Sequence, residues 1–219
     1  HTAHLASAFF SSPFQKASVL SIDGSGDFST VMLAKGVGNK LDIIKSQDFP
    51  QSVGLVYTAF TQFLGFPHYG DEYKVMGLAP YGNKNSNRFK EFTELIQNNL
   101  FLELGTEKFK LNLNYFSFDS KLSMIDYKKW EELFLIKKRI PESELNQDYC
   151  DFALAAQYIL EYLLVNLVMH SKLLQKSDNL CLAGGVALNC SAMGRIDELK
   201  IFKNIFFFIN RCFVNLWQN

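Results

Sequence analysis

Residues 18–33, SVLSIDGSGDFSTVML, decide the fold because they place a glycine-rich stretch between two apolar runs. Residues 17–22 and 28–34 are short, apolar and rich in β-branched side chains, so both are predicted strands. A tight reversal needs only one or two glycines, whereas this stretch adds a carboxylate on each side. A carboxylate at a strand end followed by Gly-x-Gly turns backbone N–H groups toward the adjacent space, where phosphate can bind beside a cation. By itself, the pattern is also typical of a simple hairpin turn.

The segments around this hairpin predict a mixed α/β fold. Residues 1–10 are typical of the end of a helix, which Ser11-Ser12-Pro13 breaks, and a third strand at 41–45 completes an antiparallel meander. Helical periodicity or composition then predicts three helices: 52–63, about 88–98, and a long one that Asp148 or Asp151 would cap and that ends near residue 175. A strand at 179–183, a glycine turn, a further helix and a strand at 204–209 follow, an order that indicates a mixed sheet flanked by helices.

Residues 101–145 show the weakest pattern. Residues 101–104 and 109–113 alternate between apolar and polar types like a hairpin, and the remainder is charged and loop-like. We therefore expect a surface insertion at about 101–145.

The amino-acid composition limits which functions are expected. The chain has 219 residues, 48% of them apolar, which is enough for a substantial core. Its 22 basic and 22 acidic residues balance. Because no net basic field is present, nucleic acid and anionic membrane surfaces are not expected partners. A balanced net charge does not exclude a local pocket that binds an anion.

The cysteines and the apolar segments indicate a cytoplasmic protein without a membrane span. Cys150, Cys181, Cys190 and Cys212 lack the spacing of a metal site and lie among apolar neighbours, so they are interpreted as reduced core thiols. No signal peptide is recognised at the start. The apolar segment 152–174 is interrupted by polar residues, which favours a core helix.

Three other features carry chemistry, each with a plain alternative. His1 and His4 would share one helix face and suit a metal, although two histidines at a chain start are more often incidental. Lys74 with Glu72 is either a phosphate contact or, as favoured, an ordinary ion pair. The Gly184-Gly185 turn after a strand either brings a ligand to a helix N-terminus or allows close packing. Spacing therefore indicates only a candidate nucleotide site.

Taken together and in order, these blocks resemble the O-carbamoyltransferase family of nodulation proteins and antibiotic-tailoring enzymes. The resemblance spans positions 1 to about 190 and rests on five blocks: HTAHLASAF at 1–9, SPF at 12–14, DGSG at 23–26, EYKVMGLAPYG at 72–82 and LAGGVALNC at 182–190.

The resemblance implies an actin-like ATPase lobe of the sugar kinase and heat-shock ATPase type, close to the threonylcarbamoyl transferases. It also implies that carbamoyl phosphate and ATP form a carbamoyl adenylate, whose carbamoyl group passes to a hydroxyl of a sugar or secondary metabolite. The expected cofactors are ATP and a divalent metal, with iron in the first place and magnesium or zinc as alternatives. A related transferase acting on tRNA is disfavoured by the neutral charge.

The resemblance also implies roles for particular residues. His4 and Asp23 match metal ligands at the catalytic centre, where a metal acts as a Lewis acid. The residues expected at the nucleotide are Gly24, Ser25, Gly26, Glu72, Lys74, Gly184, Gly185, Val186 and Asn189.

Three departures suggest a partial chain. The family has a metal-binding histidine one residue before His1 and an acidic ligand in a stretch that residues 210–219 do not resemble. Residues 1–209 are thus interpreted as part of the actin-like domain, with its first subdomain and the C-terminal carbamoyl-phosphate domain absent. The alternative to an enzyme is an inactive remnant or interaction module of the family.

Overall fold

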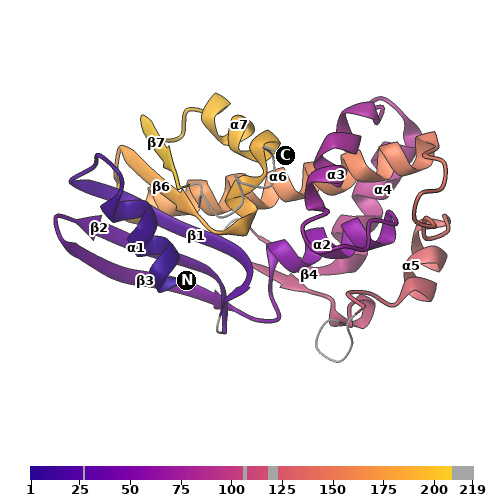
Figure 1. Cartoon of the computed structure of the whole chain (residues 1–219), viewed down its shortest axis with the longest axis horizontal. Coiled ribbons are helices and arrows are strands. Elements are labelled where there is room, and N and C mark those ends of the chain that lie inside the picture. The colour runs from indigo at the N-terminus through magenta and orange to yellow at the C-terminus, as the bar shows by residue number, and fades with distance from the viewer. Residues whose placement is uncertain (27, 106–107, 118–122, 209–219) are drawn as a thin grey trace, which may run out of the picture. The chain divides into compact units, whose positions relative to one another are not determined.

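The computed structural model describes residues 1–26, 28–105, 108–117 and 123–208 (Figure 1). The chain divides into two compact units, which are described separately: His1–Phe49 with Val168–Asn219, and Pro50–Leu167. The predicted strand end at Ile209, the tail 210–219 and Cys212 lie outside the described residues.

The first unit contains a five-stranded mixed sheet in the order β3-β2-β1-β6-β7 (Figure 1). The first three strands form the predicted antiparallel meander, whereas β6 runs parallel to both β1 and β7. The α/β class with a mixed sheet is therefore confirmed. The strand bounds are β1 (Lys16–Gly26), β2 (Ser29–Val37), β3 (Lys40–Asp48), β6 (Asn179–Ala183) and β7 (Asn204–Phe207).

The predicted turn directly after Ile22 is wrong, because β1 continues to Gly26. Ile22 pairs with Val31 and Gly26 pairs with Ser29, so the stretch between them is longer on β1 than on β2. Such an irregularity leaves residues of one strand outside the ladder and re-aims their side chains. Asp23 therefore lies in a bulged strand end, not in the reversal itself.

Helices cover both faces of this sheet. Helix α1 (Thr2–Phe10) packs its buried Leu5, Ala8 and Phe9 on one face, against Ala17, Val19, Ala34, Cys181 and Ala183. On the other face lies the end of α6 (Gln147–Gln175), where Gln175 Nε2 donates to the Ala34 carbonyl at 2.9 Å. Because side chains alternate along a strand, the odd positions of β1 face α1.

The second unit is mainly helical and is built around an aromatic core. Its helices are α2 (Val53–Phe63), α3 (Glu72–Leu78), α4 (Asn87–Leu95), α5 (Tyr127–Phe134) and the first part of α6, and its hairpin consists of β4 (Phe101–Leu104) and β5 (Phe109–Leu111). Side chains of Ser52 and Ser86 cap α2 and α4. The largest fully buried side chains of this unit are Phe60, Phe63, Phe92, Trp130, Phe134 and Phe152.

The hairpin predicted within 101–145 is confirmed, whereas the loop-like, surface character predicted for the remainder is wrong at 127–134. Tyr127–Phe134 forms α5, and its Trp130 and Phe134 are fully buried. These two residues are four positions apart and so share one helix face. The charged residues between them occupy the other face, which is why the segment looked hydrophilic in sequence. Whether 101–145 is an insertion stays a prediction.

The long helix α6 begins at Gln147, and the predicted aspartate cap is wrong. The side chain of Asn146 accepts a hydrogen bond from the Tyr149 N–H at 3.1 Å. Asp151 instead accepts from Asn83 N at 2.7 Å and from Ser86 Oγ at 2.6 Å, so it anchors the segment that follows α3. By length and composition α6 could cross a membrane, but 72% of its most apolar window is buried, as expected of a core helix.

The cysteine prediction holds for two residues. Cys150 and Cys181 are buried, and burial raises the pKa of both thiols. Cys190 is exposed at the start of α7 (Cys190–Glu198), so it is not a core thiol.

Candidate functional site

The site begins at the carboxyl ends of β1 and β6, two neighbouring parallel strands. Ser21 of β1 lies beside Ala183 of β6, so the residues that follow each of them leave the sheet at the same edge. In open α/β sheets, this edge is where ligands bind. It carries the DGSG stretch from β1 and the Gly184-Gly185 pair from β6.

These two glycine-containing stretches are in direct contact. Gly184 has φ +96, and a Cβ there would lie 2.2 Å from the carbonyl oxygen of Ile22. A Cβ on Gly185 would lie 3.0 Å from Oδ1 of Asp23. The absence of side chains at both positions therefore lets the β6 turn approach the end of β1.

Asp23 meets His4 from α1 at this edge. His4 Nδ1 lies 3.4 Å from Asp23 Oδ2, and the two side chains are 40% and 27% exposed. Asp23 Oδ1 accepts a hydrogen bond from the Gly24 N–H at 2.8 Å, which fixes the carboxylate. Asp23 follows Ile22, where the register of β1 changes, and its side chain lies against His4 of α1.

His1 lies next to His4 and is buried. Its Nδ1 is 2.8 Å from Ser21 Oγ, and its ring centroid is 6.1 Å from that of His4. Its Nε2 has no hydrogen-bond partner among the described residues and lies near Gly26. Sequence reasoning missed Ser21. Its position two residues after Val19 and four after Ala17 indicates that all three side chains share the face of β1 that α1 covers.

The pair His4 and Asp23 offers the donors of part of a metal site. Imidazole nitrogen and carboxylate oxygen suit iron and zinc, and the buried Nδ1 of His4 makes no hydrogen bond to any described residue despite its nearness to Asp23. Within the described ranges, however, no group of three or more histidine, cysteine, aspartate or glutamate side chains could hold a metal ion. The described residues thus fit two positions of such a site.

The remaining predicted residues of this edge are less enclosed. Ser25 is exposed, and Gly24 and Gly26 are partly buried. The prediction that Gly184-Gly185 leads straight into a helix is only partly right, because Gly185–Leu188 forms a short 3-10 helix and α7 begins at Cys190. Asn189 caps α7 by accepting from Ala192 N at 3.0 Å, while Val186 is partly buried in the 3-10 helix.

Glu72 and Lys74 belong to the second unit, in α3, so they are described apart from the His4–Asp23 pair. The favoured ion pair between them is wrong. Glu72 accepts from Thr58 Oγ1 at 2.6 Å, while Lys74 Nζ lies 2.9 Å from Oδ1 of Asp71, which raises the pKa of Lys74 through that hydrogen bond. Sequence reasoning missed Asp71, although an acid three positions before a lysine is a recognisable signal.

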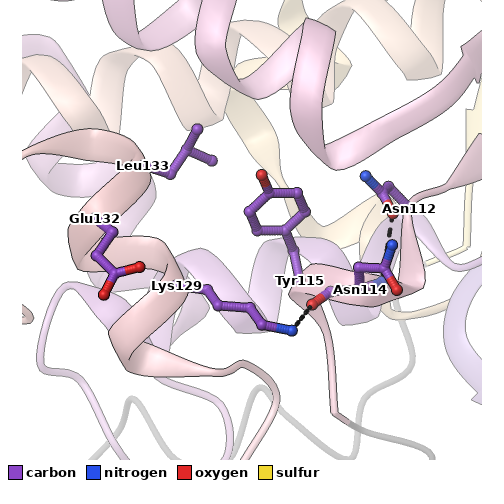
Figure 2. A pocket seen from close by; sticks show the side chains of 6 residues that line it. All are labelled: Asn112, Asn114, Tyr115, Lys129, Glu132 and Leu133. Carbon is purple, nitrogen blue, oxygen red and sulfur yellow. Dashed lines mark hydrogen bonds between the residues drawn. The ribbon is translucent and has the colours of Figure 1, made fainter.

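The second unit also has an open hollow of about 560 Å³, shown in Figure 2. Three of its six lining residues, Asn112, Asn114 and Lys129, are linked to one another by hydrogen bonds. Lys129 Nζ donates to the Asn114 carbonyl at 2.8 Å, and the Asn112 side chain donates to the Asn99 carbonyl at 2.9 Å. The lining, which is Asn112, Asn114, Tyr115, Lys129, Glu132 and Leu133, includes none of the residues predicted for the site.

Comparison with known proteins identifies relatives along nearly the whole chain. It is 43% identical over 207 residues to an uncharacterised protein of Synechocystis, sll1178, covering 94% of this chain and 32% of that protein. It is 32% identical to the nodulation protein NolNO of Sinorhizobium fredii, covering 94% and 28% respectively. It is 31% identical to the nodulation protein NolO of Bradyrhizobium diazoefficiens, covering 94% and 34%.

The chain thus spans about a third of the length of these curated relatives. The family described as "Carbamoyltransferase N-terminus" matches residues 1–210, which include every residue predicted for the site. The resemblance noted in the sequence is confirmed, and the chain belongs to the carbamoyltransferase N-terminus family.

Proposed function

We propose that this chain is part of an ATP-dependent O-carbamoyltransferase. In the proposed reaction, water releases phosphate from carbamoyl phosphate, and the resulting carbamate displaces pyrophosphate from ATP to give a carbamoyl adenylate. An acceptor hydroxyl oxygen then bonds to the carbamoyl carbon while its proton and AMP leave. One observation carries the proposal: the contact of His4 with Asp23 beside the Gly184-Gly185 turn, within a member of the carbamoyltransferase N-terminus family.

We propose further that the first unit is an actin-like ATPase lobe of the sugar kinase type. Support comes from its sheet, in which three antiparallel strands are continued by two parallel ones, with α1 and the end of α6 on opposite faces. The contact between the β1 and β6 strand ends supports a shared ligand site at that edge.

In this proposal His4 and Asp23 hold a divalent metal, with iron preferred and magnesium or zinc as alternatives. When bound, the metal supplies a Lewis acid that polarises the carbamoyl carbonyl or binds the acceptor oxygen. Asp23 is held for this role by the Gly24 N–H, so the carboxylate does not have to be ordered when the site is loaded.

The nucleotide is assigned to the glycine stretches. Gly24, Ser25 and Gly26 lie where phosphates would approach the backbone, and Gly184, Gly185, Val186 and Asn189 would lie beside the adenosine. Lys74 supplies a positive charge for a phosphate, and Glu72 orders α3 through Thr58. The acceptor is a hydroxyl-bearing small molecule in the cytoplasm, and neither nucleic acid nor membrane is a proposed partner.

Calorimetric titration of the chain with ATP, with and without ferrous ion, tests the proposal. We expect ATP binding that ferrous ion strengthens, and a loss of about tenfold or more in that metal-dependent affinity for His4→Ala and for Asp23→Ala. Truncation removes a metal donor at each position without disturbing the buried core, because both side chains are partly exposed.

Two matched variants serve as controls. His68→Ala removes an exposed histidine of the second unit, and Asp42→Ala removes an exposed carboxylate of β3. Both should bind ATP and metal like the unaltered chain. Full metal-dependent affinity in the His4 and Asp23 variants, with an unchanged melting temperature, would exclude the assigned ligands.

A further inference from the structure

Arg139 is a buried cation of the second unit. It is 5% exposed, and no carboxylate of the described residues lies within ion-pair distance of it. Its Nη1 donates to the Leu64 carbonyl at 3.2 Å and its Nη2 donates to the Ser143 carbonyl, while Nε has no partner among those residues. Burying such a group is costly, so its retention calls for a specific role.

Arg139 lies against the end of α2 and the three residues that follow it, Leu64, Gly65 and Phe66. Its backbone N–H donates to the Phe63 carbonyl at 3.0 Å, and its guanidinium binds the next carbonyl, that of Leu64. Gly65 has φ +79, and a Cβ there would lie 2.6 Å from the carbonyl oxygen of Arg139. Cζ of Arg139 lies 5.2 Å from the centroid of the Phe66 ring.

The same Phe66 ring leads to Lys74. Lys74 Nζ lies 5.5 Å from its centroid and pairs with Asp71 at 2.9 Å. Asp71 in turn accepts a hydrogen bond from the His68 N–H at 3.0 Å, which links two residues of the loop between Phe66 and α3. A continuous set of contacts therefore runs from the buried guanidinium to the ammonium group of Lys74.

We infer that Arg139 is a positioning residue for Lys74. This inference rests on the proposed function, in which Lys74 meets a phosphate of the nucleotide. A planar guanidinium donates in its plane while a ring packs on its face, and a lysine at this position could not do both. Arg139 thus fixes the Leu64 carbonyl and the Phe66 ring together, and Phe66 limits where the Lys74 ammonium can lie.

A double-mutant cycle tests the inference through ATP affinity. Arg139→Met keeps the apolar stem and removes the donors, and Lys74→Met removes the phosphate contact. We expect Arg139→Met to weaken ATP binding about fivefold when Lys74 is present and less than about twofold in the Lys74→Met background, because the effect passes through Lys74. Adenosine, which has no phosphate, should bind equally to all four proteins. Equal losses in both backgrounds would overturn the inference.

A control variant and a conservative variant separate positioning from stability. Arg88→Met removes another partly buried arginine of this unit, whose guanidinium lies 4.4 Å from the centroid of Phe92, and should leave ATP affinity unchanged. Arg139→Lys keeps a cation and an apolar stem, so it tests the role even if Arg139→Met does not fold. It should weaken ATP binding as Arg139→Met does, and unaltered affinity in it would contradict the inference.

Chemical acylation of Lys74 distinguishes failure of this inference from failure of the proposed function. Mass spectrometry after limited treatment with acetic anhydride should show faster modification of Lys74 in both Arg139 variants than in Arg88→Met, since a displaced ammonium loses its Asp71 partner. This readout does not require ATP to bind. If the chain binds no ATP but the Lys74 rate rises, the proposed function fails and the positioning role stands; an unchanged rate overturns the role.

Discussion

Gly184 has no space for a side chain, and this one residue decides whether the two strand ends can meet. Its positive φ disfavours any other residue, and the nearest obstacle to a Cβ is the backbone of Ile22, which cannot move aside like the end of a flexible side chain. By contrast, Gly194 in α7 has open space around its Cβ position and sits within a helix.

The first prediction is therefore that Gly184→Ala lowers the melting temperature of the chain and lowers the free energy of unfolding by about 2 kcal/mol or more. Gly194→Ala, the same change in an unobstructed helix, should raise that free energy by up to about 1 kcal/mol. Denaturant unfolding followed by circular dichroism measures both. Equal effects of the two substitutions would show that the β6 turn does not press against Ile22.

At this scale the sequence identified His4, Asp23 and Lys74 as chemically interesting but not their partners. The strand period was sufficient to place Ser21 on the same face of β1 as Ala17 and Val19. The i,i+3 spacing was sufficient to suggest Asp71 as the ion-pair partner of Lys74. Neither rule could show that His1 would be buried against Ser21, because that contact joins a helix to a strand across many intervening positions.

At the scale of elements, α5 is the helix that sequence reasoning missed. It contributes only Trp130 and Phe134 to the core, yet Trp130 contacts the rings of Phe60, Phe63, Phe116 and Phe134. Its indole N–H donates to the Tyr115 carbonyl at 2.8 Å, which joins α5 to the segment before it.

We predict that Trp130→Ala lowers the free energy of unfolding by about 3–5 kcal/mol, because it leaves a large cavity among aromatic rings and removes that hydrogen bond. Leu102→Ala in the neighbouring hairpin is the control, since Leu102 is 62% exposed and should cost less than about 0.5 kcal/mol. Urea unfolding followed by tryptophan-independent far-ultraviolet dichroism gives both values. A small loss for Trp130→Ala would mean that 101–145 is indeed peripheral.

At the scale of the whole molecule, the chain consists of two units that each have a buried core. Leu5, Phe9 and Val19 belong to the first core, and Phe60, Trp130 and Phe152 belong to the second. The boundary at residues 167 and 168 falls within α6, so one continuous helix contributes residues to both units.

Because each unit has its own buried core, we predict that a core substitution speeds amide hydrogen exchange only in the unit that contains it. Trp130→Ala should speed exchange of amides within Pro50–Leu167 while the amides of β1 and β2 keep their rates, and Gly184→Ala should do the reverse. Mass spectrometry of peptides from each unit measures this. A uniform rise in exchange throughout the chain in either variant would show that the two units open together.

The sequence by itself determined the local elements: the meander, α1, the strand β6 with its glycine turn, and the family to which the chain belongs. The elements follow from side-chain periodicity and from glycine positions, which act over a few neighbouring residues. The family follows instead from the resemblance of the five sequence blocks. Only the tertiary structure decided that β1 runs on to Gly26, that α5 is core and that Arg139 lies against Phe66. The last two depend on packing between segments distant in the chain, where burial free energy outweighs the local preference of a polar or irregular stretch.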